Sequence, residues 1–303
     1  MTVYRSLTMK PASFDYTAPA SLDEALALKA QHGDEAKFLA GGQSLIPAMN
    51  FRLVQAAVLV DVNGLRGLDY IRLEGSELRL GAMTRQRRLE RDALVARHSP
   101  LLHEAMPWVA HPQIRNRGTL GGSLAHADPA AELPVVAAAL GARLRAQSLR
   151  GDRWISADDF FRGLFTTDLA SDEMLVEVAL PPLPPRTGTA FTEFARRRGD
   201  YALMGVAAVV TLDENDVCQR AQLVYLNAGE GAVTARQAAA LLQGQAPSAS
   251  VIEAAAATAA DNEINPMGNV HASPEYQRHL ARVLTRRALR QAFERARTST
   301  PPS

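Results

Sequence analysis

Apolar and polar positions in the first part of the chain follow the spacing of short helices and strands. Ser21-Leu22-Asp23-Glu24 matches a helix capping box, because the serine hydroxyl can accept from the N–H three residues on and the glutamate can reach back. We expect that helix to end at Gly33. Residues 37–40 and 57–61 are apolar runs typical of buried strands, with a helical stretch over 44–53 between them. The pattern predicts a compact unit of alternating helices and strands.

The pattern changes beyond residue 69. Two strand-like segments of mixed apolar and charged residues, 70–73 and 77–80, flank a Glu-Gly-Ser turn and predict a β-hairpin. Asp128 is a suitable N-cap with Pro129 at the first helical position, so we expect a helix over 129–140. The remaining expectations for this part are helices over 89–96 and 101–109, a polar loop over 111–118 and a strand over 142–149.

A proline-rich segment, Pro181-Pro182-Leu183-Pro184-Pro185, forms the clearest boundary in the chain. Consecutive prolines fit neither a helix nor a sheet interior, so a stiff, extended connector is expected. Strand patterns follow over 189–196, 205–212 and 217–226, and alanine-rich helical stretches begin at Thr234, Ser248 and Ser273. Strands followed by helices predict a small α+β domain with a three-stranded antiparallel sheet. We expect domains at residues 9–180 and 186–293, with flexible ends at 1–8 and 297–303.

Composition and charge limit the class of function. A chain of 303 residues favours two domains over one. The formal charge is only +1, so nothing indicates a nucleic-acid or membrane-surface partner. No segment resembles a signal-peptide core, and no apolar run is long enough to span a bilayer. We therefore expect a cytoplasmic protein.

Cysteine and histidine usage restricts the kind of redox centre. The one cysteine, Cys218, cannot form an internal disulfide, nor can it alone hold an iron–sulfur cluster or a zinc ion. The seven histidines form no recognisable ligand set, so no metal site is predicted. No nucleophile–base constellation is present either, so no catalytic residue is predicted. Any redox centre must be an organic cofactor or lie on another chain.

Two glycine-rich segments carry the candidate chemistry: Ala40-Gly41-Gly42-Gln43-Ser44 and Thr119-Leu120-Gly121-Gly122-Ser123. Adjacent glycines lack Cβ atoms and permit positive φ values, so successive N–H groups can surround an anion. Ser44, Thr119 and Ser123 add hydroxyl donors. The two segments together favour a pyrophosphate site, although each alone is equally consistent with a tight turn. Neither a P-loop nor a Rossmann fingerprint is present.

Two acidic residues follow the second segment. Asp128 is best interpreted as a helix cap. Glu132 lies about one turn later, where a carboxylate could accept hydrogen bonds from ribose hydroxyls, or could simply belong to the first turn of the helix.

Longer motifs around these segments resemble the medium, FAD-binding subunit of the carbon monoxide dehydrogenase and xanthine dehydrogenase (molybdenum hydroxylase) family. The motifs are Phe38-Leu39-Ala40-Gly41-Gly42-Gln43-Ser44-Leu45-Ile46-Pro47, the run from Gln113 to Ser123, and Ala127-Asp128-Pro129-Ala130-Ala131. The resemblance extends from Met9 to about Ala292. It implies an FAD-binding domain of two α/β subdomains, of the vanillyl-alcohol-oxidase/PCMH-like type, followed by an α+β C-terminal domain.

The resemblance also implies roles for individual residues. Residues 40–45, including Leu45, and 119–123 would hold the pyrophosphate of a non-covalent FAD. Glu132 stands where the family usually has aspartate, and Gln43 replaces a frequent histidine; a site built from backbone groups should tolerate the second change. Leu169 matches a position that packs against the cofactor. Tyr201 would stack on or shield the flavin, or it is an ordinary aromatic residue at a domain interface.

The family's division of labour implies partners. The molybdenum cofactor would lie on a large partner subunit and two iron–sulfur clusters on a small one, so this chain would pass electrons from the clusters through FAD to an external acceptor. One alternative is a stand-alone FAD-dependent oxidase or dehydrogenase, which would need its own substrate pocket. Another is a nucleotide-sensing module without redox function.

Overall fold

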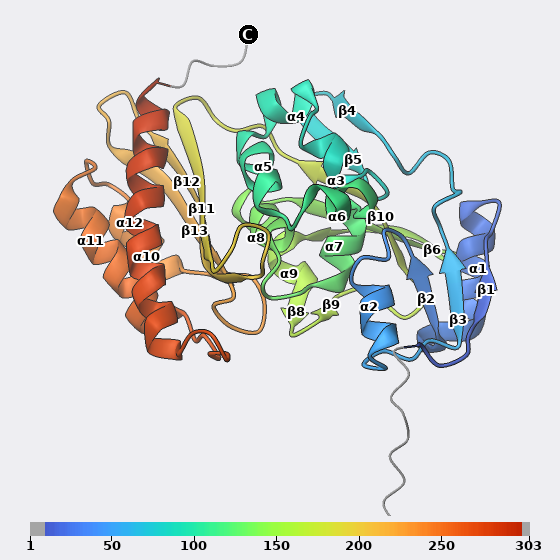
Figure 1. Ribbon diagram of the computed structural model, residues 1–303. Coiled ribbons are helices and arrows are strands. Elements are labelled where there is room, and N and C mark those ends of the chain that lie inside the picture. Colours follow the sequence, from blue (N-terminus) through green and yellow to red (C-terminus); the bar gives the residue numbers. More distant parts are fainter. Residues whose placement is uncertain (1–9, 299–303) are drawn as a thin grey trace, which may run out of the picture.

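The computed structural model describes residues 10–298, which form three layered parts (Figure 1). The first part is a parallel sheet in the order β1-β3-β2, made of β1 (Asp15–Thr17), β2 (Ala36–Leu39) and β3 (Val58–Asp61). Two helices accompany it, α1 (Leu22–His32) and α2 (Leu45–Asn50). This confirms the predicted alternation of helices and strands.

The capping box before α1 is present, with a small change in geometry. Ser21 Oγ accepts from the Glu24 N–H at 3.2 Å, and the Glu24 carboxylate accepts from the Ala20 N–H at 2.8 Å. The glutamate therefore reaches the residue before the N-cap. Gly33 ends the helix with a φ of 52°, as predicted, and begins a 3-10 turn (Gly33–Glu35).

The second part is a five-stranded antiparallel sheet in the order β4-β5-β10-β6-β7. Its strands are β4 (Ile71–Glu74), β5 (Glu77–Gly81), β6 (Arg143–Ser148), β7 (Gly151–Ser156) and β10 (Met174–Leu180). The predicted hairpin is β4–β5. Helices and turns accompany the sheet: α3 (Gln86–Leu89), α4 (Ala93–His98), α5 (Pro100–Ala105), a 3-10 turn (Met106–Trp108), α6 (Pro112–Arg117), α7 (Leu120–His126), α8 (Glu132–Ala139) and α9 (Ala157–Phe160). A small hairpin, β8 (Phe161–Gly163) and β9 (Thr166–Thr167), precedes β10.

The third part is an antiparallel sheet covered on one side by helices (Figure 1). Its strands are β11 (Thr187–Ala195), β12 (Ala202–Leu212), β13 (Cys218–Leu226) and β14 (Val233–Thr234), and its helices are α10 (Arg236–Leu242), α11 (Ala249–Thr258) and α12 (Pro274–Thr298), with a π-helical turn (Ala259–Glu263) after α11. The predicted three-stranded sheet is thus incomplete. β14 is only two residues long and pairs with Val224 and Tyr225, so it shows no alternation in the sequence.

Two other local expectations are wrong. The segment expected as a loop contains α6, in which Pro112 supplies the preset φ of the first turn and Arg115 donates to the Val109 and Ala110 carbonyls. The helix expected from Pro129 begins at Glu132, because Asp128 Oδ1 accepts from the Ala130 N–H and caps a separate turn.

The expected flexible end at 297–303 stays a prediction. α12 continues through 297 and 298, two residues into the expected flexible end, and Ala296 is fully buried against the core of the third part. The expected flexible segment 1–8 and residues 299–303 lie outside the described residues.

The third part joins the second through a common apolar core. All eight residues of α8 are buried, and this helix packs against β12 and β13. Phe191, Val209 and Leu226 from the third part belong to the same core cluster as α8. Two polar links add to this boundary: the Asn227 N–H donates to the Pro129 carbonyl at 2.7 Å, and Arg295 pairs with Glu104 at 2.6 Å. No helix between residues 10 and 298 is long and apolar enough to cross a membrane.

Candidate cofactor site

The first glycine segment connects β2 to α2 as an open turn with free donors. Gly42 has a φ of 73°, a conformation that favours glycine. Within the described chain, no acceptor receives the backbone N–H groups of residues 41–45. The Ser44 hydroxyl is also free, because it makes no capping hydrogen bond at the start of α2. Gln43 Nε2 donates to the Gly41 carbonyl at 3.1 Å and so holds the turn from within.

The second glycine segment differs from the first, because it forms the start of a helix and not an open turn. Thr119 is the N-cap of α7, and its Oγ1 accepts from the Gly122 N–H at 3.1 Å. The Leu120 and Gly121 N–H groups donate to the Thr84 and Ala82 carbonyls at 3.0 and 2.8 Å. These amides are therefore occupied, and the side chain of Leu120 is buried in the core. What remains for a ligand is the Ser123 hydroxyl, which makes no hydrogen bond within residues 10–298, together with the Thr119 hydroxyl proton and the Thr119 N–H.

The two glycine segments touch each other. A Cβ atom on Gly41 would lie 2.6 Å from the Arg117 carbonyl oxygen and 2.7 Å from Gly118 Cα. A Cβ atom on Gly122 would lie 3.7 Å from Ala40 Cβ. Glycine at position 41 thus lets the turn after β2 lie directly against the end of α6. The structure brings together the segments that the sequence places about 80 residues apart.

Asn63 and Arg85 join the same two segments, and neither was found from the sequence. Asn63 Nδ2 donates to the Ala40 carbonyl at 2.8 Å, and its Oδ1 accepts from Arg85 Nη2 at 2.6 Å. Arg85 also donates to the Arg117 carbonyl. The chain of contacts from Ala40 to Arg117 fixes the distance between the turn and α6. Single polar residues in irregular segments give no periodic signal by which this bridge could have been predicted.

Glu132 and Tyr201 lie near each other beside the second segment. Glu132 is the first residue of α8 and is buried; this burial, with the charge of Asp128, raises its pKa to about 7. Tyr201 lies between β11 and β12 with 75% of its side chain exposed. Partial desolvation of its hydroxyl, and then the carboxylates of Asp128 and Glu132, raise the pKa of Tyr201. The hydroxyl of this exposed aromatic residue of the third part thus lies within the electrostatic influence of the start of α8.

Leu169 lies in a short segment whose two ends carry the carboxylates of Asp168 and Glu173, and both carboxylates bind the same arginine, Arg153. Asp168 accepts from Arg153 at 2.8 Å and from Arg162 at 2.7 Å. Glu173 accepts from Arg153 at 2.8 Å, so one guanidinium holds both ends of the segment. Leu169 is partly buried and packs against the main core. This double contact of Arg153 was also not found from the sequence.

The segment that carries Leu169 runs beside α7. The turn between β8 and β9 carries Phe165, whose ring centroid is 5.1 Å from that of His126 at the end of α7. β9 itself contacts α7. All the predicted site residues therefore belong to segments around α7, α2 and the start of α8.

The described chain offers an organic cofactor site and no metal site. Between residues 10 and 298, no cluster of three or more His, Cys, Asp or Glu side chains could hold a metal ion. Cys218 is buried, and burial raises the pKa of its thiol to about 11, so it is not a ready nucleophile or ligand. The free amides at 41–45 and the Ser44 and Ser123 hydroxyls are donors suited to phosphate oxygens. These residues fit the pyrophosphate of a dinucleotide.

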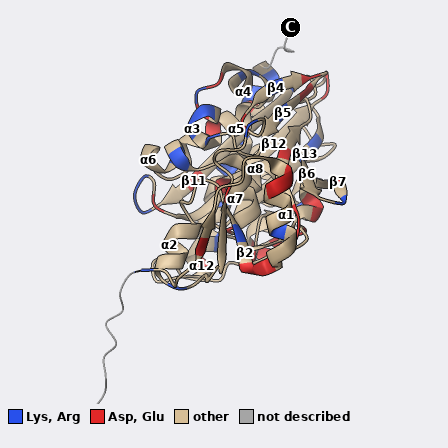
Figure 2. Cartoon of the chain, turned by 90° about the vertical axis from the view of Figure 1, so that its right-hand side faces the viewer, with Lys and Arg blue, Asp and Glu red and all other residues tan. Residues whose placement is uncertain are grey.

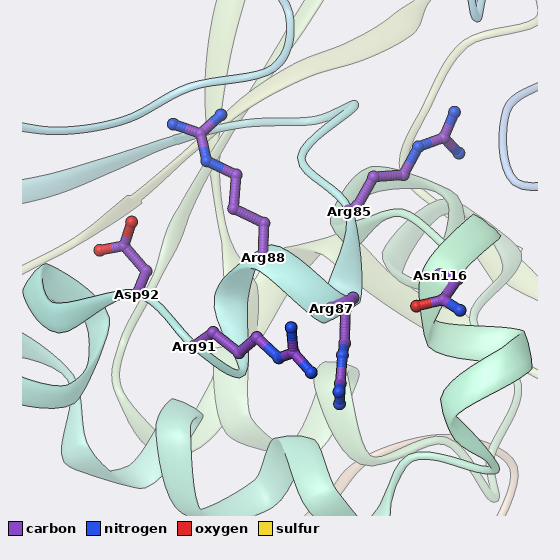
Figure 3. A pocket seen from close by; sticks show the side chains of 6 residues that line it. All are labelled: Arg85, Arg87, Arg88, Arg91, Asp92 and Asn116. Atoms are coloured by element: carbon purple, nitrogen blue, oxygen red, sulfur yellow. The ribbon is translucent and has the colours of Figure 1, made fainter.

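A basic pocket near α3 and α6 is a weaker candidate. Blue segments mark basic residues on both helices in Figure 2. The pocket is lined by Arg85, Arg87, Arg88, Arg91, Asp92 and Asn116. In Figure 3, Arg87 and Arg91 extend toward the same region, whereas Arg85 and Arg88 extend away from it. Arg87 and Arg88 also pair with Glu90 and Asp69, both at 2.7 Å. The four cations do not converge on one anion.

Comparison with known proteins gives this site its family. Residues 12–183 match the family described as "FAD binding domain in molybdopterin dehydrogenase", and residues 189–292 match "CO dehydrogenase flavoprotein C-terminal domain". The chain belongs to the flavoprotein family of the molybdopterin dehydrogenases. This confirms the resemblance inferred from the sequence, together with its FAD-binding domain.

Relatives of this flavoprotein family match over nearly their whole length. The 6-hydroxypseudooxynicotine dehydrogenase complex subunit alpha of Paenarthrobacter nicotinovorans is 46% identical, over 95% of this chain and 97% of the relative. The nicotine 6-hydroxylase medium subunit of the same organism is 39% identical, over 95% and 100%. The carbon monoxide dehydrogenase structure from Hydrogenophaga pseudoflava that lacks the Mo-pyranopterin moiety matches with a TM-score of 0.91 at 36% identity, over 94% of this chain and 99% of that one. The chain is thus an oxidoreductase flavoprotein subunit of this family.

Proposed function

We propose that this chain is the electron-transfer subunit of a three-subunit molybdenum hydroxylase. It would take electrons from iron–sulfur clusters on a small partner and pass them from FAD to an external acceptor. The observation that carries the proposal is the row of free N–H groups at residues 41–45, held against the end of α6 in a chain of this family. A nest of this kind binds an anion without any lysine or arginine.

The proposed site assigns different tasks to the two glycine segments. The amides of residues 41–45 and the Ser44 hydroxyl donate to pyrophosphate oxygens, and Ser123 and Thr119 add hydroxyl donors from α7. Glu132 binds a hydroxyl of the cofactor, Leu169 packs on it, and Tyr201 covers the flavin from the third part. When bound, FAD supplies the change between one-electron and two-electron transfer; the protein binds it, orients it and limits water access.

The proposed partners follow from what the relatives of this chain are called. Relatives named for substrates as different as nicotine and carbon monoxide match this chain along almost its full length. A common flavin subunit with the substrate pocket on another chain would account for that. We propose that the molybdenum cofactor lies on a large partner, the two clusters lie on a small one, and residues 9–180 and 186–293 are the domains of this chain.

Co-purification tests the proposal. The chain is tagged and expressed with its neighbouring reading frames, and the absorbance spectrum, metal content and subunit composition of the purified material are measured. Non-covalent FAD with molybdenum and iron in a three-chain complex supports the proposal. A yellow protein that turns over a substrate alone would replace it with the stand-alone oxidase. A colourless protein would refute the assignment of residues 41–45.

A further inference from the structure

Glu193 carries a carboxyl group into the boundary between the second and third parts of the fold. Side chains alternate along a strand, so Glu193 lies on the same face of β11 as Phe191, which packs in the core shared with α8. Glu193 is 7% exposed, and its Oε2 atom has no hydrogen-bond partner within residues 10–298. Across the ladder it faces Gly205, which the side chain of Leu226 covers. An ionised carboxylate in such surroundings is costly.

Glu132 is the second carboxyl group at this boundary. It is 8% exposed and starts α8, whereas Glu193 comes from the third part. Desolvation, and then the charge of Glu132, raise the pKa of Glu193 to about 9. Two desolvated carboxyl groups that feel each other's charge do not both ionise at neutral pH.

No neighbouring cation neutralises this pair. The charge of Arg115 on α6 lowers the pKa of Glu132, but Arg115 does not bind Glu132. Its guanidinium donates to the Glu90 carboxylate at 3.0 and 3.1 Å and to the carbonyls of Val109 and Ala110. Asp128 adds a further negative charge. No ion pair involves Glu132 or Glu193 in the described part of the chain. Other charged or titratable groups on the elements packed here include His103 and Glu104 on α5, Arg220 on β13, Tyr201, and the arginines of α12, of which Arg295 pairs with Glu104.

We propose that Glu193 is a positioning residue that acts through Glu132: the two carboxyls retain at least one proton at neutral pH, and this keeps the third part seated on the cofactor site. When that proton is lost to solvent, both buried carboxyl groups carry a negative charge, and their repulsion weakens the boundary. This inference rests on the proposed function only where it concerns FAD, because Glu132 and Tyr201 belong to the proposed cofactor site.

The first test needs no cofactor. The urea midpoint of the full-length, FAD-free chain is measured at pH 6 and pH 9 for the wild type and for Glu193→Gln. The amide introduced by this substitution cannot ionise, so the variant should lose less stability over this interval. Glu214→Gln removes an exposed carboxyl from the β12–β13 turn and should behave as the wild type does. Equal losses in the wild type and in Glu193→Gln would overturn the proposal.

If Glu193→Gln does not fold, infrared spectroscopy of the wild type gives the same answer. A protonated carboxyl band should be present at pH 6, should decrease toward pH 9, and should be smaller in Glu132→Gln. A wild-type protein without any such band at pH 6 would also overturn the proposal.

The second test concerns the cofactor. The FAD dissociation constant of the wild type should rise with pH, by up to about tenfold for each pH unit over which binding requires the proton. In Glu193→Gln it should be nearly independent of pH. If the FAD dissociation constant of the wild type does not change with pH while its stability does, the link to the cofactor is refuted. A chain that binds no FAD at any pH would instead refute the proposed function, while the first test still decides the proton-holding pair.

Discussion

Gly41→Ala tests how the two glycine segments are held together. The added Cβ atom would lie 2.6 Å from the Arg117 carbonyl oxygen and 2.7 Å from Gly118 Cα, whereas ordinary contacts begin at 3.4 Å. Both obstacles are backbone atoms, so no side chain can rotate away. The turn after β2 and the end of α6 must separate by several tenths of an ångström. Overpacking of this kind costs about 1–3 kcal/mol.

The same displacement should weaken FAD binding, because the free amides at 41–45 move relative to α7. If all the strain is relieved in the unbound protein and must be restored on binding, 1–3 kcal/mol corresponds to about 5- to 150-fold in the dissociation constant. Titration of FAD into the FAD-free chain, followed by flavin fluorescence, measures this ratio. Gly64→Ala is the matched control, because a Cβ atom there meets no atom within 4 Å. An affinity of Gly41→Ala within twofold of the control would refute the reasoning.

Three further predictions concern the surroundings of the site. Asn63→Ala removes the donor to the Ala40 carbonyl and the acceptor for Arg85, so it should lower the free energy of unfolding by about 1–3 kcal/mol in urea denaturation and weaken FAD binding; unchanged values would contradict the bridge. Arg153→Ala should make the segment around Leu169 more sensitive to limited proteolysis while changing global stability by less than about 1 kcal/mol, because this guanidinium is 44% exposed. Burial raises the pKa of Glu132 from 4.5 to about 7, so the folded chain keeps a proton that the unfolded chain loses between these pH values. The contribution of Glu132 to stability should therefore fall as pH rises through that interval, by on the order of 3 kcal/mol, and Glu132→Gln should reduce the wild-type loss by that contribution in urea denaturation, leaving the part that belongs to Glu193.

Local signals predicted those parts of the fold that local chemistry decides. The cap at Ser21 and the turn between β4 and β5 each depend on a few adjacent residues, and each is present. The family motifs went further, because they gave the FAD-binding domain and the C-terminal domain together.

Contacts between distant segments could not be predicted in this way. β14 exists only because two residues pair with β13, and α6 is stabilised by the tertiary hydrogen bonds of Arg115. Glu193 shows the same limit: in the sequence it is an ordinary polar residue of an alternating strand, no different from one that faces solvent. Its burial arises because β11 packs that face against the second part of the fold.

The two glycine segments show why similar motifs need separate physical explanations. In the first, the N–H groups remain free and Gly42 adopts a positive φ, so the glycines serve the open turn itself. In the second, the amides are used within the protein, and a Cβ atom on Gly121 would lie 2.6 Å from Ala82 Cβ. Glycine at position 121 therefore allows α7 to start directly against Ala82, the residue that follows β5 of the five-stranded sheet. In the proposed site, the first segment therefore supplies backbone donors, and the second supports that segment and adds only the Thr119 and Ser123 hydroxyls.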